Sequence, residues 1–311
     1  MGFIQLFTAA AALAGVAQAV PLEKRQGENI DVTVLQFALT LEHLENDFYK
    51  GVMQQFSEAD FLAAGFSATY YNNLKFISSD EAVHVKALSD ALTSVGETPV
   101  EPCTYSFPYT DVRSFITLSS VLEGVGTSAY LGVAPLHISQ DYLTVAGSIL
   151  AVEALHTSYQ RAAIGNVPFA NPFYTPLDPT SVFTLAGMFI QSCPASNPSL
   201  PFMPYPSLTV KGETCTCDSP DCPPQAGDTA ELQCENHVPE GSFVTFVSGL
   251  DVVSVQAEGA GDDHVSAMIP DVASGQIYVF VTKSDVEGKF DGTQVLCGPA
   301  VLEVYPNLKS V

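Results

Sequence analysis

Two Glu-x-x-His tetrads are the residues of this sequence best suited to do chemistry: Glu81 to His84 and Glu153 to His156. On a helix, positions i and i+3 lie about 60° apart, so each tetrad would point a carboxylate and an imidazole to one side. One such match is weak, because six histidines in 311 residues yield about a third of a match by composition alone. Two matches in similar surroundings are much harder to obtain by accident.

Each tetrad follows a second recurring pattern, a Leu-Glu pair with a Tyr seven residues after the Glu. The two copies are Glu42 with Tyr49 and Glu123 with Tyr130. Seven residues make nearly two helical turns, so each Glu shares a helix face with its Tyr. Four helices that direct four carboxylates and two imidazoles inward would form a two-metal carboxylate site.

The competing interpretation places these polar residues on solvated helix faces, where most Glu and His side chains lie. The surroundings argue against it, because the segments 115–126 and 146–152, which contain Glu123 and lead into Glu153, are almost free of other charges. An isolated carboxylate in an apolar helix is costly to bury unless it is paired or binds a cation. The metal hypothesis is therefore favoured.

Four long helices must position these residues. Apolar spacing and end signals predict helices at about 31–52, 68–95, 110–132 and 139–164, with a short helix at 58–62. Gly96 and Gly165 would end the second and fourth helices. The segment 96–110 can span up to ~50 Å, enough to run the length of a bundle. One long crossover would make the two hairpins parallel repeats and place both motifs at the same depth.

The second half of the sequence changes character. Residues 166–206 are rich in proline, with one apolar segment at 181–190 that predicts a fifth helix. Short β-rich runs separated by Gly, Pro and Asp then predict an antiparallel sandwich-like domain: 207–210, 243–247, 252–255, 277–282 and 300–304. His237 and His264 are isolated there, which is typical of surface histidines. This domain is expected to bind, to anchor the protein to a cell wall, or to stabilise the helical domain.

The N-terminus carries targeting signals. Residues 1–19 are apolar and end in Ala-Gln-Ala, as in a secretory signal peptide, and Lys24-Arg25 ends a propeptide at 20–25 that resembles a Kex2-type processing site. The predicted product is a secreted, soluble chain, with the following organisation: helical bundle 26–195, Pro-rich linker 196–206 and β-rich domain 207–311.

The formal net charge of −23 bears on partners. Nucleic acid and anionic membrane surfaces would be repelled, whereas cations would be enriched near the protein. An ordinary solvated surface of a secreted protein explains the acidity equally well.

Seven cysteines are candidates for disulfide bonds in an oxidising compartment: Cys103, Cys193, Cys215, Cys217, Cys222, Cys234 and Cys297. We expect Cys103 to pair with Cys193, because these are the only two in the N-terminal part. A zinc site at 215–222 is the alternative for the downstream cluster, although its spacing fits the usual zinc ligands poorly. With an odd number of cysteines, at least one is free or pairs with another molecule.

The segment Leu35 to Tyr49, together with the two tetrads, resembles the secreted ferritin-like proteins of fungi. This group is associated with stress response and late sexual development and is related to plant desiccation proteins. The resemblance covers about residues 26–193, and the distal part resembles the C-terminal domain that many of these proteins carry. It implies an all-α ferritin-like four-helix bundle followed by a small all-β domain.

The resemblance also implies a ligand set for a dinuclear centre: Glu42, Glu81, His84, Glu123, Glu153 and His156. Glu81 and Glu153 would bridge the two metals, whereas Glu42 and Glu123 would be terminal ligands. Glu45 competes with Glu42, because it lies one helical turn away. Tyr49 and Tyr130 would orient carboxylates from behind, although a plain core role is nearly as plausible for each. His43 lies about 100° around the helix from Glu42 and should face elsewhere.

Oxygen and nitrogen donors in this mixture suit iron or manganese more than copper or zinc. One hypothesis is therefore a ferroxidase-like or catalase-like oxidoreductase that acts on Fe(II), O2 or peroxide. The other is a non-catalytic stress, developmental or cell-wall protein that sequesters metal or keeps a vestigial site, with cell-wall association or self-association as its interaction. Iron storage in a closed shell is less expected, because the appended domain would hinder shell assembly. Fold similarity does not decide the reaction.

Overall fold

The computed structural model describes residues 29–136, 139–214 and 223–306. The predicted signal peptide, propeptide and processing site lie outside these ranges. So do Cys215, Cys217 and Cys222, and with them the alternative zinc site and the question of the odd cysteine. None of the helices in the described ranges combines the length and apolarity needed to cross a membrane.

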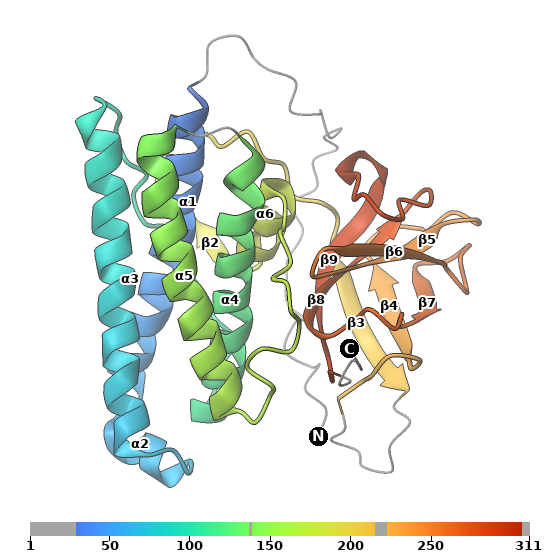
Figure 1. Ribbon diagram of the computed structural model, residues 1–311, viewed down its shortest axis with the longest axis horizontal. Coiled ribbons are helices and arrows are strands. Elements are labelled where there is room, and N and C mark those ends of the chain that lie inside the picture. The colour runs from blue at the N-terminus through green and yellow to red at the C-terminus, as the bar shows by residue number, and fades with distance from the viewer. Residues whose placement is uncertain (1–28, 137–138, 215–222, 307–311) are drawn as a thin grey trace.

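Four long helices lie side by side in the N-terminal half (Figure 1). They fall close to the predicted ranges: α1 Ile30–Gln55, α3 Ala68–Ser94, α4 Val112–Val133 and α5 Gln140–Ala163. Three shorter helices complete this region: α2 Glu58–Ala63, η1 Ala134–Leu136 and α6 Pro179–Gly187. The last of these is the predicted fifth helix, which begins two residues earlier than its apolar run because Asp178 caps it and Pro179 opens it.

Side-chain caps set where the long helices begin. Asn29, Ser67 and Asp111 each accept a hydrogen bond from a backbone N–H of the first turn of α1, α3 and α4. At the other end of α3, Gly96 has φ of +83°, the left-handed conformation that ends a helix at little cost. Gly165 has φ of +88° and does the same for α5. Both stops are the ones predicted from the sequence.

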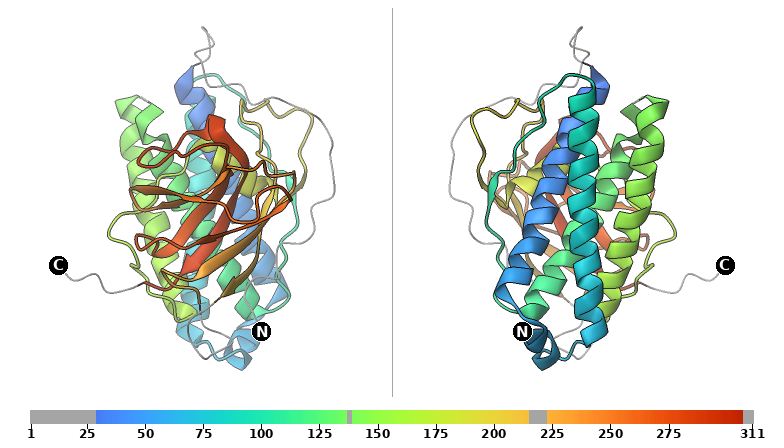
Figure 2. Two further views of the ribbon diagram at one scale, coloured as in Figure 1. Left: turned by 90° about the vertical axis from the view of Figure 1, so that its right-hand side faces the viewer. Right: turned by 90° about the vertical axis from the view of Figure 1, so that its left-hand side faces the viewer.

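The connection between α3 and α4 crosses over the helices. It contains β1 Thr104–Tyr105, which pairs antiparallel with β2 Ile190–Ser192. Beside this pair a disulfide joins Cys103 to Cys193, as expected. The helices α1 and α3 form one hairpin, α4 and α5 form the other, and α1 also contacts α4. Figure 2 shows α3 on the outer face, between α1 and α5.

Two antiparallel sheets make up the C-terminal region. One has the order β3-β4-β7, with bounds Leu208–Thr214, Thr229–Cys234 and His264–Met268. The other has the order β6-β5-β8-β9, with bounds Asp251–Gln256, Phe243–Ser248, Gly275–Thr282 and Val295–Val304, the last preceded by η2 Gly292–Gln294. A second disulfide, Cys234 to Cys297, joins β4 of the first sheet to β9 of the second. All five predicted β runs became strands, whereas β4 and β7 were not predicted.

The β-rich region lies directly against the helices, on the side of α4 and α6 (Figures 1 and 2). The apolar core between the helices continues into the second sheet through Val247, Tyr278 and Phe280. Tyr278 is 1 % exposed, and its hydroxyl donates to Ser128 Oγ on α4 at 2.8 Å. The two regions therefore share a core. The division of the chain into domains at residues 195 and 206 stays a prediction.

A partly buried ion pair also joins the two regions, and we predict its contribution to stability. Arg161 of α5 is 4 % exposed and forms two hydrogen bonds to Glu303 of β9, at 2.8 and 2.6 Å. Glu303→Gln should lower the unfolding free energy by about 1–3 kcal/mol, because the Arg161 guanidinium stays buried without its charge partner. The loss should not be larger, because Glu303 is partly exposed and solvent weakens the pair. Urea unfolding measures this. Asp90→Asn, which breaks the exposed Lys86–Asp90 pair, should change stability by less than ~0.5 kcal/mol; equal effects of the two variants would contradict the prediction.

Candidate metal centre

The four long helices bring all six sequence-predicted ligands to one place. The four carboxylates, Glu42 of α1, Glu81 of α3, Glu123 of α4 and Glu153 of α5, are each 0 % exposed. The two imidazoles are nearly as buried, with exposures of 8 % for His84 and 6 % for His156. The interpretation of these residues as solvated surface groups is therefore wrong.

Two overlapping groups of donors appear among these residues. Glu42, Glu81, His84 and Glu153 form one, and Glu81, Glu123, Glu153 and His156 form the other, each with ligand atoms within 4.8 Å of one another. Both groups contain Glu81 and Glu153. These are the two carboxylates that the resemblance implies as bridges, one from each tetrad, and each of the two groups could hold a metal ion.

The donor atoms fit a metal, because many of them have no hydrogen-bonding partner. Six buried atoms of the site are unpaired: Glu42 Oε2, Glu81 Oε1, Glu123 Oε2, both carboxylate oxygens of Glu153, and His156 Nδ1. Burying polar atoms without partners costs about 1–3 kcal/mol each. A structure keeps so many of them together where cations can satisfy them.

The imidazoles point the same ring nitrogen at the carboxylates. His84 Nδ1 lies 3.3 Å from Glu42 Oε2, 3.3 Å from Glu153 Oε1 and 3.4 Å from Glu81 Oε2. His156 Nδ1 lies 3.0 Å from Glu81 Oε1 and 3.4 Å from Glu123 Oε2, without the alignment of a hydrogen bond to either. One nitrogen facing several carboxylate oxygens is the arrangement that a shared cation requires.

Behind His156, the other ring nitrogen faces a carboxylate. Nε2 of His156 lies 3.4 Å from Asp80 Oδ2 on α3. Metal-binding histidines commonly donate their second N–H to such a group, which fixes the ring orientation. This role of Asp80 was not predicted from the sequence. The only indication of it was that Asp80 directly precedes the predicted ligand Glu81.

Each of the two tyrosines donates a hydrogen bond to a buried carboxylate on a different helix. Tyr130 of α4 donates to Glu42 Oε1 of α1 at 2.5 Å, and Tyr49 of α1 donates to Glu123 Oε1 of α4. In both cases the Oε2 atom of the same carboxylate stays unpaired and faces the imidazole. Each tyrosine therefore leaves one oxygen of its Glu for a cation.

The Tyr49 side has a further hydrogen-bonded layer that the sequence did not reveal. Gln160 Nε2 donates to the Tyr49 hydroxyl at 3.2 Å, and Tyr70 donates to Gln160 Oε1. The Tyr49 oxygen also lies 2.7 Å from Ser119 Oγ. Because Gln160 donates to it, the Tyr49 proton is directed at a neighbouring acceptor such as Glu123. The only sequence signal was that Gln160 follows His156 by one helical turn.

Glu45 is a fifth buried carboxylate, 4 % exposed, beside the cluster rather than in place of Glu42. It belongs to neither donor group. A Cβ atom at Gly126 would lie 2.7 Å from Glu45 Oε1 and 3.2 Å from Glu153 Oε2, so the absence of a side chain there makes room for both carboxylates. His43 points away from the cluster, as predicted, with Nε2 at 3.0 Å from Val100 O.

Burial and mutual pairing shift the pKa values of these groups. Burial raises the pKa of Glu42 to about 7, and raises the pKa values of Glu45 and Glu153 well above 4.5. Burial alone would raise the pKa of Glu81 too, but contacts with His156 and His84 lower it to about 2.

The imidazoles shift the other way. Burial opposes their charged form, yet contacts with Glu153, Glu42 and Glu81 raise the pKa of His84 to about 12. Contacts with Glu123 and Glu81 likewise raise the pKa of His156 to about 11. Without a cation, the cluster therefore holds protons in place of metals.

The tyrosine contacts give a prediction on metal affinity. Tyr130→Phe removes the donor to Glu42 Oε1 and should weaken metal binding about 10–100-fold, the usual effect of losing a group that orients a ligand. Tyr49→Phe should do the same through Glu123. Chelator competition measures the affinity, and Tyr109→Phe, away from the site, is the matched control. An affinity unchanged in both variants would assign the two tyrosines a plain core role.

The comparisons with known proteins agree with this geometry. Residues 30–166 match the model of the ferritin-like domain. The ferritin-like domain so defined spans α1 to α5 and contains all six predicted ligands. The N-terminal region is therefore a ferritin-like helical region, followed by antiparallel sheets.

A fungal protein is also similar. Protein rds1 of Schizosaccharomyces pombe is 27% identical over 180 residues, which cover 58% of this chain and 44% of that protein. The match thus spans less than half the length of the relative. This likeness to a fungal protein and the ferritin-like domain are both in line with the resemblance seen in the sequence.

A solved structure of a conserved hypothetical protein from Mycobacterium tuberculosis aligns with 46% of this chain and 96% of its own. The identity is 18% and the TM-score 0.38. At that TM-score the likeness supports no conclusion about this chain.

Proposed function

We propose that this chain is a secreted metalloprotein whose ferritin-like region is a four-helix bundle around a dinuclear iron or manganese centre. The centre serves to oxidise Fe(II) or to consume peroxide or dioxygen, in stress response or development. The observation that carries the proposal is the pair of donor groups that share Glu81 and Glu153. Their carboxylate and imidazole donors match the preferences of these two metals.

Each residue of the site has a distinct role in this proposal. Glu81 and Glu153, which belong to both donor groups, would hold both cations, and His84 and His156 would each hold one of them. Glu42 and Glu123 would complete the two donor groups, and the hydrogen bonds from Tyr130 and Tyr49 keep these two carboxylates in place. When both metals are bound, each would change its oxidation state by one electron, so the pair would supply the two electrons that reduce dioxygen to peroxide or peroxide to water.

The remaining groups control protons and water around the site. The carboxylates are fully buried, so bulk water is excluded and their charges act at full strength on whatever binds between them. Glu45 lies beside Glu153, with a pKa raised by burial, and can hold a proton there. Asp80 fixes the orientation of His156.

Secretion and biological setting rest on other observations. The two disulfides are consistent with an oxidising compartment, as the predicted signal peptide and processing site require. The setting in stress response and development comes from the resemblance to secreted fungal proteins. The shared core with the second sheet favours a stabilising role for the β-rich region over the wall-anchoring alternative.

The proposal is tested by turnover. Protein purified from its secreting host is loaded with Fe(II) or Mn(II), and Fe(II) oxidation in air and loss of hydrogen peroxide are followed separately. Catalysis above the rate of free metal, absent from a Glu81→Gln, Glu153→Gln variant, supports the oxidoreductase. Full metal loading with neither reaction would contradict the oxidoreductase. It would favour the alternative from the sequence, a non-catalytic protein that sequesters metal.

A further inference from the structure

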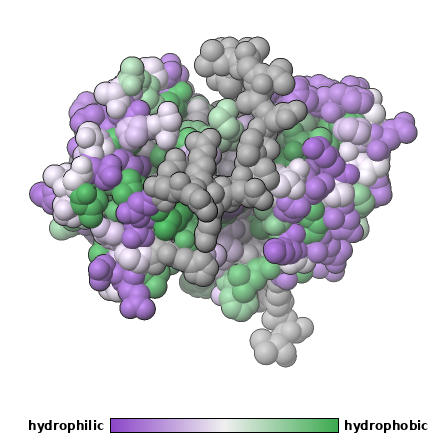
Figure 3. Space-filling model, turned by 90° about the horizontal axis from the view of Figure 1, so that it is seen from above, coloured by the Kyte–Doolittle hydropathy of each residue, from purple (hydrophilic) through white to green (hydrophobic). Residues whose placement is uncertain are grey.

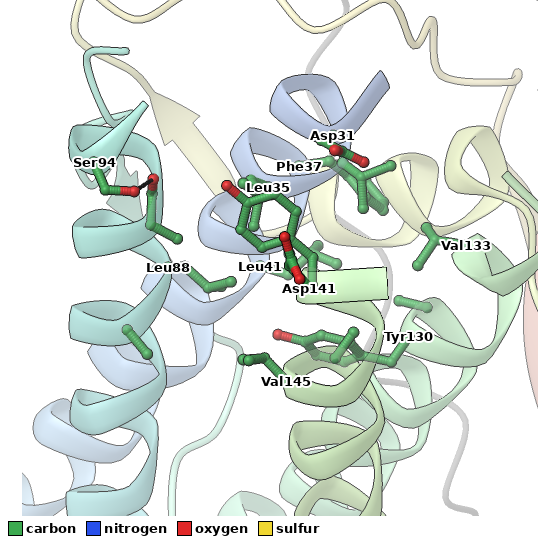
Figure 4. A pocket seen from close by; sticks show the side chains of 17 residues that line it. Asp31, Leu35, Phe37, Leu41, Leu88, Ser94, Tyr130, Val133, Asp141 and Val145 are labelled. Atoms are coloured by element: carbon green, nitrogen blue, oxygen red, sulfur yellow. Dashed lines mark hydrogen bonds between the residues drawn. The ribbon is translucent and has the colours of Figure 1, made fainter. Parts of the chain in front are cut away.

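An apolar cavity of about 340 Å³ lies at one end of the helical region, beside the site but outside it. It is bounded by the first turns of α1 and α5 and by the last turns of α3 and α4 (Figure 4). Its walls are aliphatic, with side chains that include Val34, Leu35, Leu88, Val133 and Val145. Seen from above, hydrophobic residues lie among hydrophilic ones over the helical region at the left (Figure 3).

The inner end of this cavity is Tyr130, whose hydroxyl donates to Glu42. Ala38 and Leu88, which also line the cavity, lie one helical turn from Glu42 and His84 respectively. The cavity therefore reaches the Tyr130 side of the donor cluster. The Tyr49 side is instead backed by the Gln160 and Tyr70 hydrogen bonds.

The outer end of the cavity carries negative charge. Asp31 and Asp141 stand in the first turns of α1 and α5, and both line the cavity. The backbone N–H of Ser139 donates to Asp31 Oδ1 at 2.8 Å, which ties the start of α5 to the start of α1 and keeps both carboxylates at this end. Tyr142 adds an aromatic ring to the lining, and no Lys, Arg or His is among the described residues that line the cavity.

We propose that this cavity binds a small amphiphile with an aliphatic body and a positively charged ammonium head. The body would replace water along the aliphatic walls, which is where the binding free energy arises. The head would lie between the two carboxylates and over the Tyr142 ring, an arrangement that favours cations. A carboxylate head group would be repelled there, because it would face Asp31 and Asp141 without a counter-ion, on a chain whose net charge is −23.

Calorimetric titration of the metal-free protein tests this without reference to metal chemistry. The probes are n-octylammonium, octan-1-ol and octanoate, which share one chain length and differ in head-group charge. Octylammonium should bind most tightly, and octanoate at least about tenfold more weakly. Hexylammonium should bind about 15-fold more weakly than octylammonium, at about fourfold for each methylene lost.

Two variants on α5 locate the binding. Ala146 lines the cavity, so Ala146→Leu should narrow it and weaken the binding of every probe. Ala151 is exposed on the same helix, and Ala151→Leu is the matched control, which should bind as the parent does. Asp141→Asn should weaken octylammonium about three- to tenfold and leave octan-1-ol unchanged.

Each contrary outcome overturns the proposal. Absence of saturable binding by all probes, or binding as tight in Ala146→Leu as in the parent, would show that the cavity is not the site. Octanoate binding as tightly as octylammonium would refute the cationic head. Thermal unfolding of both leucine variants verifies that they are folded. Because no metal is added, a failure here is distinct from a failure of the proposed function.

Discussion

Replacing Glu81 and Glu153 together by Gln is expected to abolish metal binding by this protein. Both residues belong to both donor groups, so their loss removes two donors from each proposed cation at once. An amide oxygen is a far weaker ligand than a carboxylate for such cations. Elemental analysis after loading should fall from about two ions per chain to below ~0.2, with affinity lowered by more than ~100-fold.

A matched control carries the same charge change at the surface. Glu97 and Glu101 are exposed, and Glu97→Gln with Glu101→Gln should leave loading unchanged. The site variant should also be folded, since uncharged amides are less costly to bury than carboxylates and the metal-free variant should be at least as stable as the parent. Normal metal content in the site variant would place the metal elsewhere.

The metal-free protein is expected to lose stability as the pH rises from 5 to 7.5. The pKa of Glu42 is raised from 4.5 to about 7, so between these values the folded state binds more protons than the unfolded state. The unfolding free energy must then fall as the pH rises, by about 2 kcal/mol from this group over this range. His84 and His156 act in the same direction, because their pKa values are raised from 6.5 in the folded state. Their stabilisation of the fold is complete below about pH 6.5 and is lost as the pH rises toward and through their folded pKa values.

Urea unfolding in the presence of a chelator measures this slope. The lowered pKa of Glu81 contributes in the opposite direction only below pH 4.5, so the range from 5 to 7.5 avoids it. Glu42→Gln should make the slope shallower, because one of the groups that titrate in this range is gone. Metal-loaded protein should behave oppositely, with the stabilisation by metal growing as the pH rises, since ligands must lose their protons to bind. A metal-free protein that becomes more stable toward pH 7.5 would contradict the account.

The helices and the cluster of polar residues were predictable because the signals were local. Charged residues in long apolar helices stand out in the sequence, and Gly96 and Gly165 mark helix ends through their own backbone preferences. The spacing of Glu and His within a tetrad fixes their common direction once a helix forms. The convergence of all six groups followed from these two facts and from the crossover.

The remaining contacts depend on how the helices and strands meet. Tyr49 and Tyr130 share a face with Glu42 and Glu123, but only the packed helices show that each tyrosine donates across to the other helix. Gln160 carries no distinctive pattern. The strands β4 and β7 were missed because Ala, Cys and Met occupy positions where β-branched residues give the usual signal, although Ala230, Leu232 and Cys234 alternate toward the core.

The central claim is that two cations lie between the six buried side chains, bridged by Glu81 and Glu153. Anomalous X-ray diffraction from crystals of the natively metallated protein, recorded on both sides of the iron and manganese absorption edges, tests it most directly. We predict two neighbouring peaks: one beside Glu42 and His84, the other beside Glu123 and His156, with both bridging carboxylates in contact with each. A single peak, or metal found only away from these residues, would contradict the account.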